Sequence, residues 1–321
     1  FRLKESRGEF QGFDINILQI KTCIHIMRKF NKIAVIGIGK WGKNLIHDFS
    51  KISHITKCSS NGDPNNIKWL KKNYPNIEYV HKLENIFDDP EIDAVIISTS
   101  IKSHFSITKK ALKSKKHVFV EKPIATNVSQ ANELIKMAKK NNLLLFVGHV
   151  FLYNEIFQKI AKISKREQIK FMNFKWNKFG TFDEDIFLNI LSHDISIILK
   201  LFGMPNFFNL INSFGFISKC DLINLFLEFK NTQCFIHLDR FSNENKKHVT
   251  IFTKKNVYIW DDVKLFKNSA KDKSFKLIFQ SKTTPLENES KEFIKQLNAT
   301  KISNSSSKLA KDVIQLIDQI K

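Results

Sequence analysis

KIAVIGIGKWG, residues 32–42, is the stretch that decides the fold. A β-branched apolar run leads into the pattern Gly-x-Gly-x-x-Gly formed by Gly37, Gly39 and Gly42, and a helix is expected from about Lys40 to Phe49. In such a turn the first glycine permits a tight bend, the second leaves room for a pyrophosphate, and the third lets helix and strand pack closely. The helix dipole and its first N–H groups then favour phosphates. The motif in this context predicts a dinucleotide-binding site.

Strands and helices alternate along the chain that follows. Apolar runs predict strands at 54–58, 77–80, 94–98, 117–120 and 143–147, with helices at 65–73, 104–114 and 129–140 between them. Such alternation is typical of βαβ units and a doubly wound parallel sheet. After about Gly148 longer strands are expected, at 169–177, 207–217, 222–230, 233–241 and 249–260. The sequence therefore predicts an α/β Rossmann domain followed by an α+β domain with a large, mostly antiparallel sheet.

The expected organisation has four parts. They are a poorly ordered N-terminal extension at 1–28, a dinucleotide-binding Rossmann domain at 29–148, an α+β substrate and oligomerisation domain at 149–288, and C-terminal helices at 289–321 that pack back on the body. A helix from Ile186 to Phe202 is expected to face the cleft. Because the chain begins with Phe1 and Met27 stands just before the first strand, we interpret residues 1–26 as an upstream extension. The alternative is a genuine additional N-terminal element.

The formal net charge of +21 raises the question of nucleic-acid binding. Only five of the 52 basic residues are arginines, whereas base-reading and phosphate-clamping proteins rely on arginine for bidentate contacts. The lysines are spread over the whole chain beside abundant Asn, Ile and Phe, residue types that share A/T-rich codons. We therefore interpret the charge as a genomic bias and expect no nucleic-acid partner.

The spacing of the cysteines and the length of the apolar runs indicate in which cellular compartment the protein is expected. Cys23, Cys58, Cys220 and Cys234 are scattered without a metal-type spacing, and the ten histidines form no metal-ligand grouping. The apolar runs fall far short of the roughly 20 residues that a spanning helix needs. We expect a cytoplasmic protein with reduced thiols, no metal site and no membrane partner.

A second stretch carries a family resemblance. KHVFVEKPIA, residues 116–125, resembles the Glu-Lys-Pro signature of the glucose–fructose oxidoreductase/inositol dehydrogenase (Gfo/Idh/MocA) family. The similarity runs from about residue 30 to the C-terminus and includes Trp41–Asn44, Ile92–Ile97 before His104, Gly148-His149 before Tyr153-Asn154, and Ser192–Asp194. The Trp41 form of the turn and the His193-Asp194 pair are most similar to members that act on nucleotide-linked or N-acetylated sugars.

The resemblance implies roles for three catalytic residues. Lys122 would lie beside the nicotinamide and the reacting carbon, where an ammonium can polarise a carbonyl or hydrogen-bond a hydroxyl. His193 would take the proton of the substrate hydroxyl. Members of the family usually have an Asp four residues before this His, on the same helical face, but this chain has Asn189. Asp194 lies about 100° further round the helix and cannot simply replace that carboxylate.

Asn189 can bind a hydroxyl but cannot accept a proton, and three interpretations follow. Catalysis continues on Lys122 and His193 alone, which we favour; substrate preference has shifted; or the protein binds ligand without turnover.

The remaining expected site residues line the cofactor and the substrate. Cofactor contacts are expected from Gly37, Ile38, Gly39, Lys40, Trp41, Gly42, Asn61, Ser98, Thr99, His104, Glu121 and Lys122, and substrate contacts from His149, Tyr153, Asn154 and Asp194. Asn61 occupies the position at which an acid would bind the ribose hydroxyls of NAD, and Lys57 is near. NAD(H) is favoured, with NADP(H) as the alternative.

The resemblance as a whole implies an NAD(P)-dependent oxidoreductase that acts on a carbinol or ketone carbon of a sugar or sugar nucleotide, such as a UDP-N-acetyl sugar 3-dehydrogenase. The alternative is a non-catalytic regulatory or sensor member of the same family. A homo-oligomer, dimer or tetramer, is expected through the antiparallel sheet.

Overall fold

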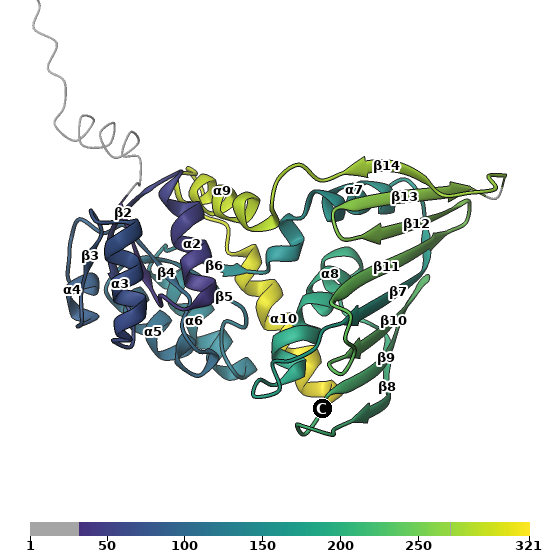
Figure 1. The fold of residues 1–321 in the computed structure, drawn as a ribbon, viewed down its shortest axis with the longest axis horizontal. Helices are drawn as coiled ribbons and strands as arrows, with labels where there is room; N and C mark the ends of the chain where they lie inside the picture. Colours follow the sequence, from purple (N-terminus) through teal and green to yellow (C-terminus); the bar gives the residue numbers. More distant parts are fainter. Residues whose placement is uncertain (1–31, 270) are drawn as a thin grey trace, which may run out of the picture.

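The computed structural model describes residues 32–269 and 271–321. The extension expected at 1–28, and with it the interpretation of Met27, lies outside the described residues. The described chain forms two β-sheets at opposite ends of the molecule, with helices between them (Figure 1). Within these residues none of the helices combines the length and the apolar character that a membrane crossing requires.

The first sheet has six strands in the order β3-β2-β1-β4-β5-β6, and all of its strand pairs are parallel. The strands are β1 (Lys32–Ile36), β2 (His54–Ser59), β3 (Glu78–Tyr79), β4 (Ala94–Ile97), β5 (His117–Glu121) and β6 (Leu145–Gly148). This order confirms the predicted Rossmann sheet. Strand order reverses between β1 and β4, and in doubly wound sheets ligands bind at the carboxyl ends of the strands beside that reversal.

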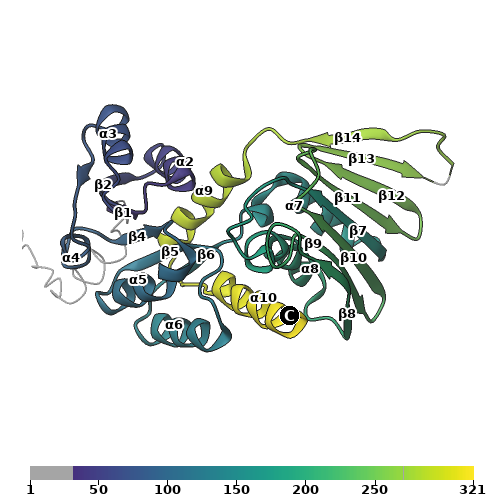
Figure 2. The ribbon, with the colours of Figure 1, turned by 60° about the horizontal axis from the view of Figure 1, so that its bottom comes forward.

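Helices cover both faces of this sheet (Figure 2). They are α2 (Lys40–Ser50), α3 (Pro64–Asn73), α4 (Glu84–Phe87), α5 (Ile101–Lys113) and α6 (Val128–Lys140). Phe49 of α2 and Leu70 of α3 pack with Phe119 on one face, while Leu112 of α5 and Leu134 of α6 pack on the other. Burial of these apolar side chains is the main favourable contribution to the fold of this region.

The two C-terminal helices, α9 (Pro285–Leu297) and α10 (Ser305–Ile320), fix the position of one sheet relative to the other. Phe293 of α9 lies edge-on to Phe119, with ring centroids 5.6 Å apart, and so completes the α2 face of the first sheet. In α10, Ile314 packs against the first sheet, whereas Ile317 joins the core of the second. One helix therefore contributes to both cores.

The second sheet has eight strands in the order β14-β13-β12-β11-β7-β10-β9-β8. They are β7 (Ile169–Asn177), β8 (Phe207–Phe214), β9 (Leu222–Phe229), β10 (Thr232–Asp239), β11 (Lys246–Thr253), β12 (Asn256–Asp261), β13 (Lys264–Ser269) and β14 (Lys276–Gln280). Only β7 and β10 pair in parallel, which confirms the expected mostly antiparallel sheet. The inner face packs against α7 (Glu155–Ser164) and α8 (Ser192–Phe202).

The structure corrects the prediction in the second half of the chain. The single strand expected at 249–260 is a hairpin of β11 and β12. The turn between these strands contains no Gly, Pro or Asn-Gly, the residues by which a hairpin turn is recognised in a sequence. The hydroxyl of Thr253 stabilises the turn instead, by accepting the N–H groups of Lys255 and Asn256. Strands β13 and β14 and helices α4 and α7 were not expected. The cleft helix expected at 186–202 begins as a π-helical turn, η2 (Phe187–Leu191), before α8.

Candidate active site

The glycine turn between β1 and α2 requires glycine at two of its three positions for steric reasons. Gly37 has a φ of +109°, and a Cβ there would lie 2.3 Å from the carbonyl oxygen of Ser98 in the adjacent strand end. A Cβ at Gly42 would lie 2.0 Å from the carbonyl oxygen of Gly37. Both distances are far below van der Waals contact. The first and third glycines therefore hold strand and helix in close contact.

Gly39 is a glycine for a different reason. It precedes α2 as its N-cap with ordinary extended dihedrals, and a Cβ there would meet no atom within 4 Å. No side chain caps this helix, and its first turn carries no acidic residue. The N–H groups that begin α2 thus face open space beside the positive end of a helix dipole, an arrangement that suits an anion. The described residues fit the pyrophosphate of a dinucleotide.

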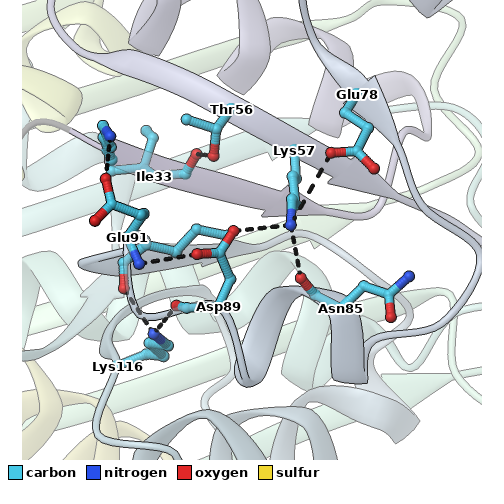
Figure 3. Close-up of polar contacts among 10 residues, drawn as sticks. Ile33, Thr56, Lys57, Glu78, Asn85, Asp89, Glu91 and Lys116 are labelled. Carbon is cyan, nitrogen blue, oxygen red and sulfur yellow. Dashed lines mark hydrogen bonds and ion pairs between the residues drawn. The ribbon is translucent and has the colours of Figure 1, made fainter.

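The end of β2 bears on the choice of dinucleotide. Gly37 donates its N–H to the carbonyl of Ser59 (2.8 Å), which places Asn61 just beyond the turn, exposed. Lys57, the nearest cation in the sequence, lies 2.8 Å from a carboxylate oxygen of Asp89 and donates to the carbonyl of Asn85 (3.0 Å), as Figure 3 shows. Lys57 lowers the pKa of Asp89 through this contact. The ammonium of Lys57 is therefore committed to a structural contact.

Strand β5 ends in Glu121, and Lys122 follows it at the carboxyl edge of the sheet. Burial raises the pKa of Glu121, while the indole N–H of Trp41, which donates to its Oε1 at 2.6 Å, and the charge of Lys122 oppose the rise. Trp41 comes from the glycine turn, so this hydrogen bond ties the start of α2 to the end of β5. It connects two of the stretches that the sequence singled out.

The ammonium of Lys122 contacts the element that carries the other predicted catalytic residues. It donates to the main-chain carbonyl of Asn189 at 2.6 Å and lies 3.1 Å from its Oδ1. Burial lowers the pKa of Lys122, and the neighbouring Glu121 opposes the shift. Lys122 and Asn189 thus come together from the two halves of the chain, and the lysine is poised to lose its proton more readily than an exposed one.

Asn189 lies inside the π-helical turn η2. The side chain of Asp185 begins this turn by accepting the N–H groups of Phe187 (2.8 Å) and Leu188 (3.2 Å). Such π turns are rare and often occur at functional sites, because they re-aim side chains and carbonyls relative to a regular helix. Here the turn presents both the carbonyl and the amide of Asn189 to Lys122, so the lysine is held by two oxygens of one residue.

His193 follows in the first turn of α8. Its ring lies 5.0 Å from that of Phe151 and 5.6 Å from that of Trp176, and its Nδ1 is buried without a hydrogen-bond partner. Burial, together with the charges of Lys122 and Lys247, places its pKa well below that of a free histidine. His193 is therefore neutral at physiological pH and a weaker base than a free histidine.

His149 follows the last strand of the first sheet and resembles His193 in its surroundings. It is buried, neither ring nitrogen has a partner, and burial with the nearby Lys122 lowers its pKa to about 3. The charge of His149, when present, also acts on His193. Two neutral imidazoles therefore lie in the surroundings of Lys122.

Asp194 occupies the interior. Its carboxylate is fully buried, and the ammonium of Lys247 from β11 lies 2.5 Å away. Lys247 also lies over the rings of Phe151 (3.9 Å) and Trp176 (4.1 Å), the same two rings that flank His193. Burial raises the pKa of Asp194 and lowers that of Lys247, and their mutual attraction opposes both shifts. This ion pair therefore packs against the two rings that flank His193.

The other expected residues fill structural positions. The ring nitrogens of His104 lie 2.8 Å from the carbonyl of Pro123 and 3.0 Å from that of Thr99, so His104 links two loops at the cofactor edge. Asn154 accepts the N–H of Ile156 and begins α7. Tyr153 packs on Phe146, with ring centroids 5.8 Å apart.

Tyr153 lines a groove of about 720 Å³ between α7, α9 and α10. His149 is also among its lining residues, but Lys122, Asn189 and His193 are not. The structure therefore places Tyr153 and His149 on one groove, and their expected contact with the substrate stays a prediction. Among the described residues no cluster of three or more His, Cys, Asp and Glu side chains could hold a metal ion.

Sequence reasoning missed the residues of β7 and β11 that surround His193. Trp176 and Lys247 come from strands far along the chain and meet α8 only through the sheet register, in which they are direct partners. A signal existed for Lys247. It shares the inward phase of its strand with the buried Val249 and Ile251, and a lysine at such a position requires a buried partner.

Comparison with known proteins agrees with this geometry. Residues 31–149 match the model of GFO_IDH_MocA, an oxidoreductase family with a NAD-binding Rossmann fold. The chain is 30% identical over 151 residues to scyllo-inositol 2-dehydrogenase (NADP(+)) IolW of Bacillus subtilis, covering 42% of each protein. It is 25% identical over 166 residues to UDP-N-acetylglucosamine 3-dehydrogenase of Acidithiobacillus ferrooxidans, covering 50% of this chain and 53% of the relative. The matched region thus spans about half the length of these curated relatives or less.

Solved structures extend the likeness in fold to both sheets. The crystal structure of UDP-N-acetylglucosamine 3-dehydrogenase GnnA from A. ferrooxidans matches with a TM-score of 0.82 at 19% identity, covering 90% of this chain and 96% of that one. An oxidoreductase from Agrobacterium radiobacter, solved in complex with NAD+, L-tartaric acid and magnesium, matches with a TM-score of 0.79 at 15% identity, covering 91% and 95%. At these identities the likeness establishes the fold alone.

Proposed function

Because residues 31–149 match the model of the GFO_IDH_MocA oxidoreductase family, we propose that the chain is a member of that family and that it oxidises a carbinol carbon, or reduces the corresponding ketone, of a sugar or sugar nucleotide with a nicotinamide dinucleotide. The observation that carries this proposal is the contact of Lys122 with Asn189. It places a buried ammonium between the carboxyl edge of the Rossmann sheet and the element that bears His193. Two relatives named as dehydrogenases, one of an inositol and one of a UDP-sugar, support the substrate class.

The cofactor would be held by the glycine turn and the start of α2, where Gly39 leaves open space. A bound nicotinamide would supply the acceptor or donor of hydride. We favour NAD(H), because Lys57 is bound to Asp89 and so does not offer a free cation for a 2′-phosphate. NADP(H) remains the alternative, supported by the named cofactor of IolW.

The chain's own residues would move the proton. In the oxidation, neutral His193 accepts the proton of the substrate hydroxyl as the C–H bond breaks. Lys122, as an ammonium, hydrogen-bonds the oxygen on which negative charge develops and so stabilises it. Asn189 orients Lys122 through its carbonyl and amide oxygens. Reduction runs through the same groups in reverse, with the imidazolium of His193 returning its proton.

A second function is favoured by one observation. Asn189 stands where the family usually has an aspartate, and an amide neither accepts a proton nor stabilises a charged His193. A protein that binds sugar and dinucleotide as a sensor, without turnover, would tolerate this exchange.

We further propose a homo-oligomer through the open face of the second sheet. That face carries Phe171, Phe226, Phe235, Phe252 and Ile259 partly exposed to solvent, and unpaired apolar sheet faces of this kind commonly pack against a partner. The dimer or tetramer and the cytoplasmic location stay predictions.

The test is turnover in Lys122→Ala. Wild-type protein is incubated with NAD+ or NADP+ and a panel of UDP-sugars and inositols, and the absorbance of the reduced cofactor is followed. Lys122→Ala should lower the rate roughly a hundredfold to ten-thousandfold, the usual contribution of a positioned acid–base group, with dinucleotide affinity near that of the wild type. Lys139→Ala, an exposed lysine on α6, is the matched control.

A fully active Lys122→Ala variant would refute the catalytic assignment. Wild-type protein that binds dinucleotide and sugar but reduces no cofactor would instead support the sensor.

A further inference from the structure

Lys178, the first residue after β7, is a lysine whose charge has no partner. Its backbone N–H is fixed by the carbonyl of Asp239 at 2.8 Å, and its side chain is only partly exposed. Among the described residues no carboxylate lies within ion-pair distance of its ammonium and no acceptor hydrogen-bonds it. A lysine that gives up part of its hydration without gaining a counter-charge is held at a cost in free energy. Such costs are typical of binding sites.

The ammonium of Lys178 borders the predicted catalytic group. It lies 5.7 Å above the ring of Trp176, and the same ring lies 5.6 Å from the imidazole of His193. The charge of Lys178 contributes to lowering the pKa of both Lys122 and His193. Lys178 therefore lies close to the predicted catalytic group, at the end of a strand of the second sheet.

The charge at the start of α2 also acts on Lys178. The charge of Lys40, the first residue of α2, contributes to lowering the pKa of Lys178, although burial is the larger cause. The ammonium groups of Lys178 and Lys40 are therefore close enough to repel each other. Repulsion among the lysines at 40, 122 and 178 is opposed by two carboxylates, that of Glu121, which acts on Lys122, and that of Glu184, which acts on both Lys122 and Lys178. Three ammonium groups thus meet two carboxylates, and an anionic ligand would neutralise the remaining positive charge.

We propose that Lys178 binds a phosphate of the substrate, so that the protein selects phosphorylated or nucleotide-linked sugars over neutral polyols. The inference rests on the proposed oxidoreductase function and narrows its substrate class. A phosphate oxygen suits this position because lysine binds phosphate as a compact point charge and needs no bidentate geometry. A neutral inositol would leave Lys178 without a counter-charge.

The dinucleotide carries phosphates too, so the experiment separates the two sources. Equilibrium binding is measured by titration calorimetry with NAD+ alone, and then with UDP-N-acetylglucosamine, UDP and N-acetylglucosamine on protein saturated with NAD+. Lys178→Gln removes the charge and Lys178→Arg retains it. Lys175→Gln is the matched control, because Lys175 lies on the same strand, is exposed, and loses the same charge.

Lys178→Gln should weaken binding of UDP-N-acetylglucosamine and of UDP roughly tenfold to a hundredfold, the range expected for one charge-assisted contact. Affinity for NAD+ and for N-acetylglucosamine should stay unchanged. Lys178→Arg and Lys175→Gln should bind the UDP ligands like the wild type. In turnover, Lys178→Gln should raise KM for the UDP-sugar.

Three results would overturn the proposal. They are UDP binding unaffected in Lys178→Gln, a loss confined to NAD+, and a wild-type protein that binds N-acetylglucosamine or inositol but neither UDP nor UDP-N-acetylglucosamine. Because binding is measured without turnover, each of these can occur while Lys122→Ala still abolishes activity, so the two hypotheses fail independently.

Discussion

The candidate site has two sides, which we call the nucleotide wall (the glycine turn and α2) and the opposite wall (α8 and β11), and the two are built on different principles. On the nucleotide wall, Gly37 and Gly42 act by having no side chain, so that a strand, a turn and a helix approach within contact distance. On the opposite wall, Asp194 and Lys247 act by burying charge between α8 and β11. The first wall is a property of backbone geometry. The second is a property of side chains that meet only after the sheet has formed.

This difference predicts how each wall responds to substitution. The geometry of the turn depends only on neighbouring residues, so a side chain added at Gly39 should weaken binding of the dinucleotide and leave the fold intact. A buried ion pair is a long-range contact, so removing one partner leaves the other charged or unpaired in the interior and acts on the whole domain. The effects of substitution should therefore be larger and less specific on the second wall.

The largest effect is expected from Asp194→Asn. The substitution leaves Lys247 fully buried beside Phe151 and Trp176 without a carboxylate, and breaking such a pair costs about 3–5 kcal/mol. Urea unfolding followed by tryptophan fluorescence measures this loss. Turnover should fall as well, because the same two rings flank His193.

Two variants sharpen this measurement. Glu287→Gln removes one charge of the exposed pair with Lys291 on α9 and should cost no more than about 0.5 kcal/mol. The double variant Asp194→Leu with Lys247→Met replaces both charges by apolar groups and should recover most of the stability lost in Asp194→Asn. If Asp194→Asn proved no more destabilising than Glu287→Gln, the second wall would not depend on buried charge.

A smaller and more selective effect is expected from Gly39→Ala. The residue has ordinary dihedrals and the new methyl group meets no protein atom, so the melting temperature should not change. The methyl would instead occupy the space into which a pyrophosphate fits. We expect NAD+ affinity, measured by fluorescence titration, to fall roughly tenfold, or about 1.4 kcal/mol.

Gly42→Ala is the contrasting variant on the same turn. Its Cβ would lie 2.0 Å from the carbonyl of Gly37, so the protein itself should be destabilised, by about 1–3 kcal/mol as in other overpacked sites. A Gly39→Ala protein that bound NAD+ like the wild type would show that the dinucleotide does not approach this turn. The account of the nucleotide wall would then be wrong.

The same contrast explains what could be predicted from the sequence. The Rossmann sheet, its helices and the glycine turn were predictable because each depends on neighbouring residues: an apolar run, a turn residue, a helical period. Lys122 directly follows a strand of that sheet, a position that supports the role implied by the family resemblance of its Glu-Lys-Pro stretch. The hairpin at 246–261 could not be predicted, because its turn is stabilised by the Thr253 hydroxyl without a glycine or proline signal.

The candidate site was only half predictable for the same reason. Lys122, Asn189 and His193 were identified by resemblance, but the carbonyl of Asn189 as the main acceptor of Lys122 was not. That contact depends on a π-helical turn, which leaves no mark in hydrophobic periodicity. Lys178 could not be predicted either, because its position near Trp176 and His193 follows from the place of β7 in the second sheet and not from a motif.

The smallest effect is expected from Asn189→Asp, at the contact between the two sides of the site, where Lys122 donates to Asn189. Asn189→Asp places a carboxylate within hydrogen-bond distance of the Lys122 ammonium, and a close opposite charge raises the pKa of a lysine by about one unit or more. In the wild type, burial holds the pKa of Lys122 below the usual 10.5. Wild-type kcat/KM should therefore decline with rising pH at a pH below 10.5, as Lys122 loses its proton. In Asn189→Asp the decline should move to higher pH, and the rate should rise if the missing carboxylate limits catalysis.

Glu121→Gln provides the opposite test of the same coupling. The charge of Glu121 raises the pKa of Lys122, so its removal should move the decline of kcat/KM to lower pH. A decline that stays at one pH in wild type, Asn189→Asp and Glu121→Gln would exclude Lys122 as the group that titrates. If the pH dependence shifts in both directions while the maximal rate does not change, the amide at position 189 suffices for catalysis, and the aspartate usual in the family serves only to set the proton affinity of the lysine.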